Sequence, residues 1–182
     1  QGSFTKPDLD FAVGLARQAA IAIDIARLFE ESQQAKMAAD ESRRQMADII
    51  DFLPDSTFVI DREGKVIAWN RAIEQMTGVK AATILGKGDF EYSVPFYGER
   101  RPILIDLVQV PQEEMEKKYA TIHRDGETLF GEAFTPLLHG TGRHLLATAS
   151  VLRDANGKVV GAIESIRDIT ARKQAEEELK EA

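Results

Sequence analysis

The chain of 182 residues is long enough for one domain and part of a second. Because 43% of its residues are hydrophobic, it can form a packed core. Lys and Arg number 23 and Asp and Glu number 30, so the net charge of −7 argues against nucleic acid or an anionic membrane as the main partner. No cysteine is present, which excludes disulfides, thiolate catalysis, cysteine-ligated zinc, thioether-linked haem and a flavin–cysteine adduct. No run of about 18 apolar residues and no signal-peptide layout occur, so we expect a cytoplasmic protein without membrane insertion.

Residues 7–53 are predicted to form one long helix, which starts at Pro7-Asp8 and ends before Pro54. Apolar or small residues recur in it at steps of four and three, the period of a coiled-coil seam. The seam consists of Ile21, Ile25, Leu28, Ser32, Ala35, Ala39, Ser42, Met46 and Ile49. We therefore expect a homodimer of modest strength through this helix. The two copies should be parallel, because a relay needs both C-terminal helices on the same side. The alternative is a helix packed on its own domain.

After Pro54 the apolar period changes to two, which is typical of strands. The expected strands are Thr57–Asp61, Lys65–Trp69, Glu127–Leu138, Arg143–Arg153 and Lys158–Asp168. The expected helical segments are Arg71–Met76, capped by Asn70 and closed by Gly78, a segment at about 99–109 that starts near Pro102, and Gln112–Tyr119. This order predicts an α+β domain in which helices cover one face of a five-stranded antiparallel sheet.

The last strand runs without a break into a charged helical pattern across Asp168-Ile169-Thr170. Asp168 or Thr170 can cap the new helix by accepting from its first-turn N–H groups. A shift of the sheet would then pass directly to the helix, so these three residues are the candidate relay.

Five segments together resemble PAS sensor domains over about residues 48–172. They are the hairpin and cap Thr57–Asn70, the helix Ala72–Gly78, the segment Leu85-Gly86-Lys87, the turn and strand Asp154–Gly161, and the strand-to-helix junction above. Residues 4–31 resemble the closing helix of GAF domains. The resemblances imply the end of a GAF-like domain at 1–31, a coiled-coil linker at 32–53, a PAS domain at 54–170 and the start of a signalling helix at 171–182.

No catalytic machinery is visible in the sequence. His123-Arg124-Asp125 matches part of a protein-kinase catalytic loop, but Phe130 stands where that loop needs a metal-binding Asn, and Asp125-Gly126 reads better as a turn. His123, His139 and His144 fall in strand or turn regions, unlike the phosphoacceptor of a histidine kinase. We therefore expect no enzymatic activity and no metal site in these residues.

A pocket between sheet and helices is the remaining candidate site. Its candidate lining residues are Trp69, Met76, Phe90, Tyr92, Phe96, Tyr97, Arg100, Ile103, Leu107, Phe130, Phe134, Leu146 and Ile163. Arg100 and Arg101 could bind an acidic ligand group, although exposed basic residues at a helix start explain them as well. In haem-binding PAS domains the ligating His is on the helix facing the sheet, and the segment at about 99–109 has none. We expect no tightly bound cofactor.

The resemblance implies a sensory and relay module of a cytoplasmic multidomain signalling protein, above all a two-component sensor histidine kinase acting in a phosphorelay. A ligand- or GAF-derived signal would pass through paired helices to an output domain downstream. One alternative is a ligand-free dimerisation spacer. Another is the sensor part of a cyclic-di-GMP enzyme.

Overall fold

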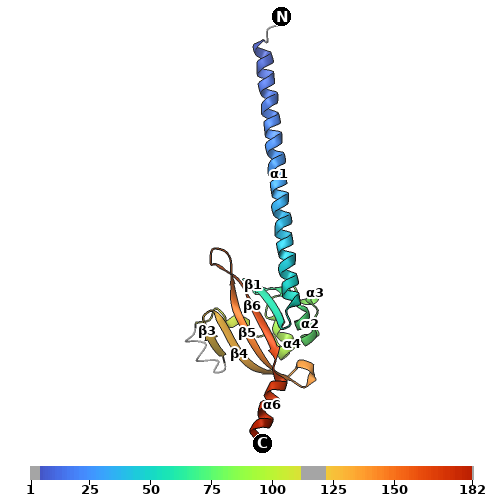
Figure 1. Cartoon of the computed structure of the whole chain (residues 1–182), viewed down its shortest axis with the longest axis vertical. Helices are drawn as coiled ribbons and strands as arrows, with labels where there is room; N and C mark the ends of the chain where they lie inside the picture. The colour runs from blue at the N-terminus through green and yellow to red at the C-terminus, as the bar shows by residue number, and fades with distance from the viewer. Residues whose placement is uncertain (1–4, 112–121, 182) are drawn as a thin grey trace. The chain divides into compact units, whose positions relative to one another are not determined.

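The computed structural model describes residues 5–111 and 122–181 and consists of two compact units, Gln1–Met46 and Ala47–Ala182 (Figure 1). The first unit is the larger part of helix α1, Lys6–Phe52, which confirms the predicted long helix. The seam residues are largely exposed in the single chain: Ile25 is 62% and Leu28 60% exposed. A partner for this seam remains a prediction.

The second unit contains an antiparallel sheet with the strand order β2-β1-β6-β5-β4-β3. The strands are β1 Ser56–Asp61, β2 Val66–Trp69, β3 Ile122–Asp125, β4 Thr128–Thr135, β5 Arg143–Arg153 and β6 Val159–Asp168. This confirms the predicted α+β class, but with six strands instead of five. The additional strand β3 is a short edge strand with three polar residues, so it has no alternating apolar pattern to predict it.

Short helices connect and cover the sheet (Figure 1). They are α2 Arg71–Thr77, α3 Ala81–Ile84, η1 Glu91–Ser93, α4 Val94–Tyr97, η2 Leu104–Leu107 and η3 Leu138–Gly140. The helix predicted at about 99–109 is reduced to the single 3₁₀ turn η2. The Asp106 carboxylate accepts from the Ile103 backbone N–H at 2.8 Å and from the Tyr92 hydroxyl at 2.5 Å, which holds this segment against the core as a tight turn. The predicted helical turn Gln112–Tyr119 lies outside the described residues.

Asn70 caps α2 as predicted, and its side chain also joins three other segments. The Oδ1 atom accepts from the N–H groups of Ile73 at 3.0 Å and Thr57 at 2.9 Å. The Nδ2 atom donates to the carbonyl oxygens of Ile50 at 3.1 Å and Asp55 at 3.0 Å. One buried amide therefore attaches the end of α1 to both β1 and α2.

At the other end of the domain, β6 leads into helix α6, Thr170–Glu181, with only Ile169 between them (Figure 1). Ile169 is buried, and its N–H donates to the His144 carbonyl oxygen of β5 at 2.9 Å. The start of α6 is thus tied to the sheet by main-chain bonding.

Candidate functional site

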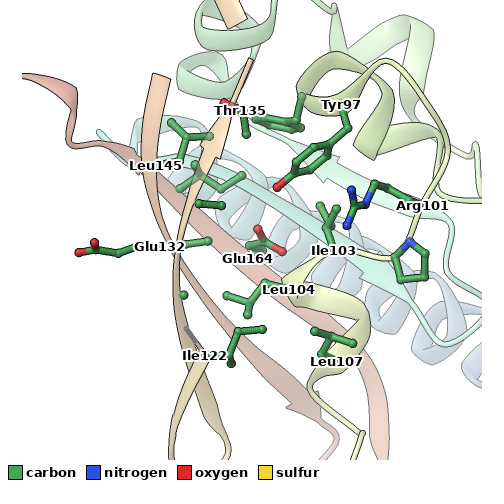
Figure 2. A pocket seen from close by; sticks show the side chains of 16 residues that line it. Tyr97, Arg101, Ile103, Leu104, Leu107, Ile122, Glu132, Thr135, Leu145 and Glu164 are labelled. Carbon is green, nitrogen blue, oxygen red and sulfur yellow. The ribbon is translucent and has the colours of Figure 1, made fainter. Parts of the chain in front are cut away.

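A cavity of about 180 Å³ lies between the inner face of β4, β5 and β6 and the segment that runs from α4 to η2 (Figure 2). The sheet supplies small side chains, including Gly131 and Ala147, which are directly paired across β4 and β5. The α4–η2 segment supplies large ones. The lining residues are Phe96, Tyr97, Arg101, Pro102, Ile103, Leu104, Leu107, Ile122, Gly131, Glu132, Ala133, Thr135, Leu145, Ala147, Glu164 and Ile166.

Glu164 is the buried acid of this cavity. It is on the inner face of β6, paired with Phe58 and Ala149, and only 2% exposed. Its Oε2 atom accepts from the Ile105 backbone N–H at 2.7 Å, while Oε1 has no hydrogen-bond partner among residues 5–111 and 122–181. Burial raises the pKa of Glu164 to about 8, against the weaker opposing effect of the Ile105 bond. At neutral pH the group is therefore mainly a neutral carboxylic acid that can donate from Oε1.

Tyr97 and Arg101 reach the same cavity from the α4–η2 side. The Arg101 guanidinium carbon lies 4.7 Å from the centre of the Tyr97 ring, a cation–π arrangement. In Figure 2 the Tyr97 hydroxyl points over Glu164, and the Arg101 head group lies beside the Tyr97 ring. Burial raises the pKa of Tyr97, so the hydroxyl stays protonated and can donate. Three donors thus surround one part of an otherwise apolar cavity.

A second acid lies close to Glu164. Asp106 accepts from the Tyr92 hydroxyl and the Ile103 N–H, so its oxygens are engaged within the protein. Burial raises the pKa of Asp106, and burial together with this carboxylate raises that of Tyr92. The charge of Asp106 also contributes to the raised pKa of Glu164.

The structure brings only some of the predicted pocket residues together. Phe96, Ile103 and Leu107 line the cavity, as does Tyr97. Trp69 and Tyr92 belong instead to the buried hydrophobic core, and Met76 and Phe90 pack against it. Within it, the rings of Phe58 and Tyr92 are 5.2 Å apart and the Trp69 indole donates to the Val79 carbonyl oxygen at 3.0 Å.

Four predicted residues lie on the opposite face of the sheet. Phe130 and Phe134 alternate with Gly131 and Thr135, which line the cavity, so they face away from it. Leu146 and Ile163 alternate in the same way with the lining residues of β5 and β6. The prediction placed these strands with the wrong face inward.

The two neighbouring arginines have different roles. Arg100 donates to Glu91 at 2.9 Å and to Asp89 at 2.8 Å in an exposed network, and it does not line the cavity. Hydrogen bonding to Glu91 raises the pKa of Arg100. Arg101 is the arginine that reaches the cavity.

Glu164 and Thr135 were missed by sequence reasoning. Glu164 reads in sequence as an ordinary polar position of a half-exposed strand, between Ile163 and Ser165. The only signal that could have found it is its spacing of two from Ile166 and Ala162, which would have put all three on one face.

The predicted relay residues occupy the junction between β6 and α6. The Asp168 Oδ1 atom accepts from the Thr170 N–H at 2.8 Å, and the Thr170 hydroxyl accepts from the His144 N–H of β5 at 2.9 Å. Asp168 also pairs with Arg143 at 3.3 Å. Asp168 therefore caps the start of α6, while Thr170 binds β5.

Glu132 connects α6 to β4, a contact that the sequence did not predict. Its carboxylate pairs with Arg172 at 2.8 Å and with Lys173 at 2.6 Å. These bonds, first to Lys173 and then to Arg172, lower the pKa of Glu132. Figure 2 shows the Glu132 side chain pointing away from the cavity, so the backbone of this residue lines the cavity while its carboxylate holds α6.

In the described part of the chain, no group of three or more His, Asp or Glu side chains is arranged to hold a metal ion. His123-Arg124-Asp125 forms β3 and leads into the Asp125-Gly126 turn. None of the helices in the described ranges is long and apolar enough to cross a membrane.

The family model described as the PAS fold matches residues 50–174, and the chain belongs to this family. It therefore contains a PAS sensory domain. No curated protein matches the chain.

Among solved structures, the chain is similar to an RNA-binding light-oxygen-voltage receptor, with a TM-score of 0.53 and 17% identity over 76% of this chain and 36% of that one. It is also similar to phage VqmA in a complex with DPO, with a TM-score of 0.52 and 17% identity over 80% of this chain and 61% of that one. The PAS domain of BvgS from Bordetella pertussis is 24% identical over 81% of this chain and 99% of that one, with a TM-score of 0.49. At these identities the likeness concerns the fold.

Proposed function

We propose that the chain is a small-molecule sensing and relay module, in which occupancy of the cavity changes the position of α6. The observation that carries this proposal is the placement of Glu164. It is buried, it has a free oxygen toward the cavity, and it is on the strand that continues into α6. A buried carboxylic acid with an oxygen open to a cavity is expected to bind a partner there, and the cavity has room for a small ligand.

Two routes connect the cavity to α6. Along β6, Glu164 and Ile166 line the cavity, and the buried Ile169 follows immediately before the helix. Across the sheet, the backbone of Glu132 lines the cavity while its carboxylate binds two cations of α6. A ligand that separates β4 from the α4–η2 segment would therefore act on α6 through both strands.

The proposal for the wider context rests on the exposed seam of α1 and on the resemblance of residues 4–31 to the closing helix of GAF domains. We propose that two copies pair in parallel through this seam, because a relay to a shared output needs both α6 helices on the same side. The parent protein would be a cytoplasmic multidomain signalling protein, with a GAF domain before this segment and a histidine kinase as its output. A cyclic-di-GMP enzyme is the alternative output. The segment itself has no catalytic role.

Filling the cavity with a side chain tests the relay without a ligand. Ala147→Leu adds a larger apolar side chain to the cavity floor, and Thr148→Leu is the matched control on the opposite face of the same strand. We expect amide hydrogen exchange at residues 169–176 to change at least twofold in the first variant and to stay unchanged in the control. If Ala147→Leu is folded and leaves this exchange unchanged, the relay proposal fails and the ligand-free spacer is favoured.

A further inference from the structure

The chemistry of the cavity indicates the class of its ligand, an inference that rests on the proposed sensing function. Glu164, Tyr97 and Arg101 are polar side chains of the cavity wall, and Arg101 lies on the Tyr97 ring (Figure 2). Like Glu164 Oε1, the Tyr97 hydroxyl has no hydrogen-bond partner in the ranges 5–111 and 122–181. Two unpartnered donors and a guanidinium at one place suit a ligand group with several acceptor oxygens.

We propose that the cavity binds a small monocarboxylate whose carboxylate lies against Arg101, Tyr97 and Glu164 and whose apolar body fills the remaining space. Arginine binds carboxylates through two parallel N–H donors, and a tyrosine hydroxyl or a carboxylic acid adds a short, charge-assisted bond. Such a ligand satisfies all three groups at once.

The size of the cavity limits the body of the ligand to about one ring. A buried apolar cavity of about 150 Å³ accommodates benzene in another protein. The cavity here has a volume of about 180 Å³ and apolar walls that include Leu104, Leu107 and Leu145. A single ring or a short branched chain with one carboxylate therefore fits, whereas a nucleotide or haem does not.

The charges around the cavity favour an anion over a cation. Arg101 is positive and lies on the Tyr97 ring, and the titratable groups that interact with Glu164 are Tyr92 of η1, Tyr97 of α4 and Asp106 of η2. Asp106 is already engaged by Tyr92 and Ile103. An amine ligand would need an ionised Glu164 and would be opposed by Arg101, while a carboxylate needs the neutral acid that burial already favours.

Three ring compounds of equal size distinguish these ligand classes. Benzoate, benzamide and benzylamine differ only in the group presented to the three donors, and binding to the whole chain can be measured by calorimetry at pH 6.5. We expect benzoate to bind at least tenfold more tightly than benzamide, and benzylamine not to bind. Preferential binding of benzylamine, or no binding of benzoate at millimolar concentration, would overturn the carboxylate proposal.

Two arginine variants locate the carboxylate. Arg101→Gln should weaken benzoate binding at least tenfold, whereas Arg100→Gln should leave it unchanged, because Arg100 is engaged by Asp89 and Glu91 outside the cavity. Equal effects of the two variants would contradict the proposal. The Ala147→Leu exchange experiment uses no ligand, so a failure here is separable from a failure of the relay.

A glutamine at position 164 tests the protonated acid. Gln retains an acceptor for the Ile105 N–H and a donor toward the cavity, so Glu164→Gln should keep benzoate binding. In the unmodified chain, benzoate affinity should fall as pH rises from 7 to 9 and Glu164 ionises, while the variant should show no such fall. A pH-independent affinity in the unmodified chain would contradict the role of Glu164.

Discussion

The two helical attachments of the PAS domain are built from different interactions. The end of α1 is held by the buried amide of Asn70, which bonds to carbonyl and N–H groups of five residues in the flanking segments. The start of α6 is held by one main-chain bond of Ile169, a cap, one hydroxyl and partly exposed ion pairs of Glu132. Buried hydrogen bonds are costly to break, while exposed ion pairs contribute little to stability. We call the attachment of α1 the fixed entry and the attachment of α6 the adjustable exit. A relay toward α6 requires the second to be the more easily changed.

The largest effect is expected at the fixed attachment. Asn70→Ala leaves the N–H groups of Thr57 and Ile73 and three part-buried carbonyl groups without their partner, so the free energy of unfolding should fall by about 3 kcal/mol. Urea denaturation followed by fluorescence of Trp69, the single tryptophan, measures this. Asn70→Asp keeps the acceptor and loses the amide donor. Near pH 4 its free energy of unfolding should therefore lie between that of the unmodified chain and that of Asn70→Ala. A loss below about 1 kcal/mol would contradict the fixed entry.

Glu164, which is on the strand β6 that leads to α6, should make the stability of the domain depend on pH. In the folded chain the pKa of Glu164 is about 8, which is above that of an unfolded Glu. Its contribution to the free energy of unfolding is therefore complete below about pH 4.5 and is lost as the pH rises toward 8. Relative to Glu164→Gln, the unmodified chain should lose on the order of 4 kcal/mol across this window. Urea denaturation of both proteins at pH 4.5, 6 and 8 measures the difference. If the free energies of unfolding of the two proteins changed with pH in parallel, Glu164 would ionise as easily in the folded chain as in the unfolded chain.

The cap and hydroxyl at the exit should have smaller effects on stability. Thr170→Val removes the acceptor of the His144 N–H, and Asp168→Ala removes the acceptor of the Thr170 N–H. Each should lower the free energy of unfolding by about 1 kcal/mol, and Asp168→Ala should also uncouple the output in the full-length protein. Denaturation of the domain and a signalling assay measure the two effects separately. Unfolding of the domain by Asp168→Ala would make the residue a structural cap alone.

The smallest effect on stability is expected for the ion pairs of Glu132. Glu132→Gln should leave the denaturation midpoint nearly unchanged but raise the hydrogen-exchange rate of α6, because Arg172 and Lys173 lose their common partner. Glu127→Gln is the matched control, since it breaks an exposed pair with Arg153 far from the exit. Equal exchange rates in the two variants would contradict an adjustable exit held by Glu132.

The sequence predicted the local features well because their signals are local. Asn70 stands directly before an apolar helical pattern, so its capping role could be inferred. Its bonds to Ile50 and Asp55 depend on the tertiary fold and have no signal in the sequence. The same holds for the contact of Glu132 with α6.

The inward face of the sheet was harder to predict because adjacent residues of the strands are both apolar. Leu129-Phe130 and Leu145-Leu146 present an apolar side chain to each face, so either choice agrees with a period of two. The strands are in register, with Phe130 opposite Thr148 and Thr148 opposite Ser165. One wrong choice of face therefore assigned four residues to the cavity that face away from it: Phe130, Phe134, Leu146 and Ile163. The same choice assigned Glu164 to the outer face.

Strand β4 has a consequence for how such domains can diversify. Gly131 and Ala133 border the cavity on one face, whereas Glu132 between them binds α6 from the other. Substitutions at 131 and 133 can therefore reshape the cavity while the contact of Glu132 with α6 is inherited unchanged. An insertion of one residue before Gly131 would instead exchange the two faces, placing a charge in the cavity and leaving α6 without its anion. Point substitution in this strand can thus change the cavity and keep the contact with α6, whereas insertion disrupts both.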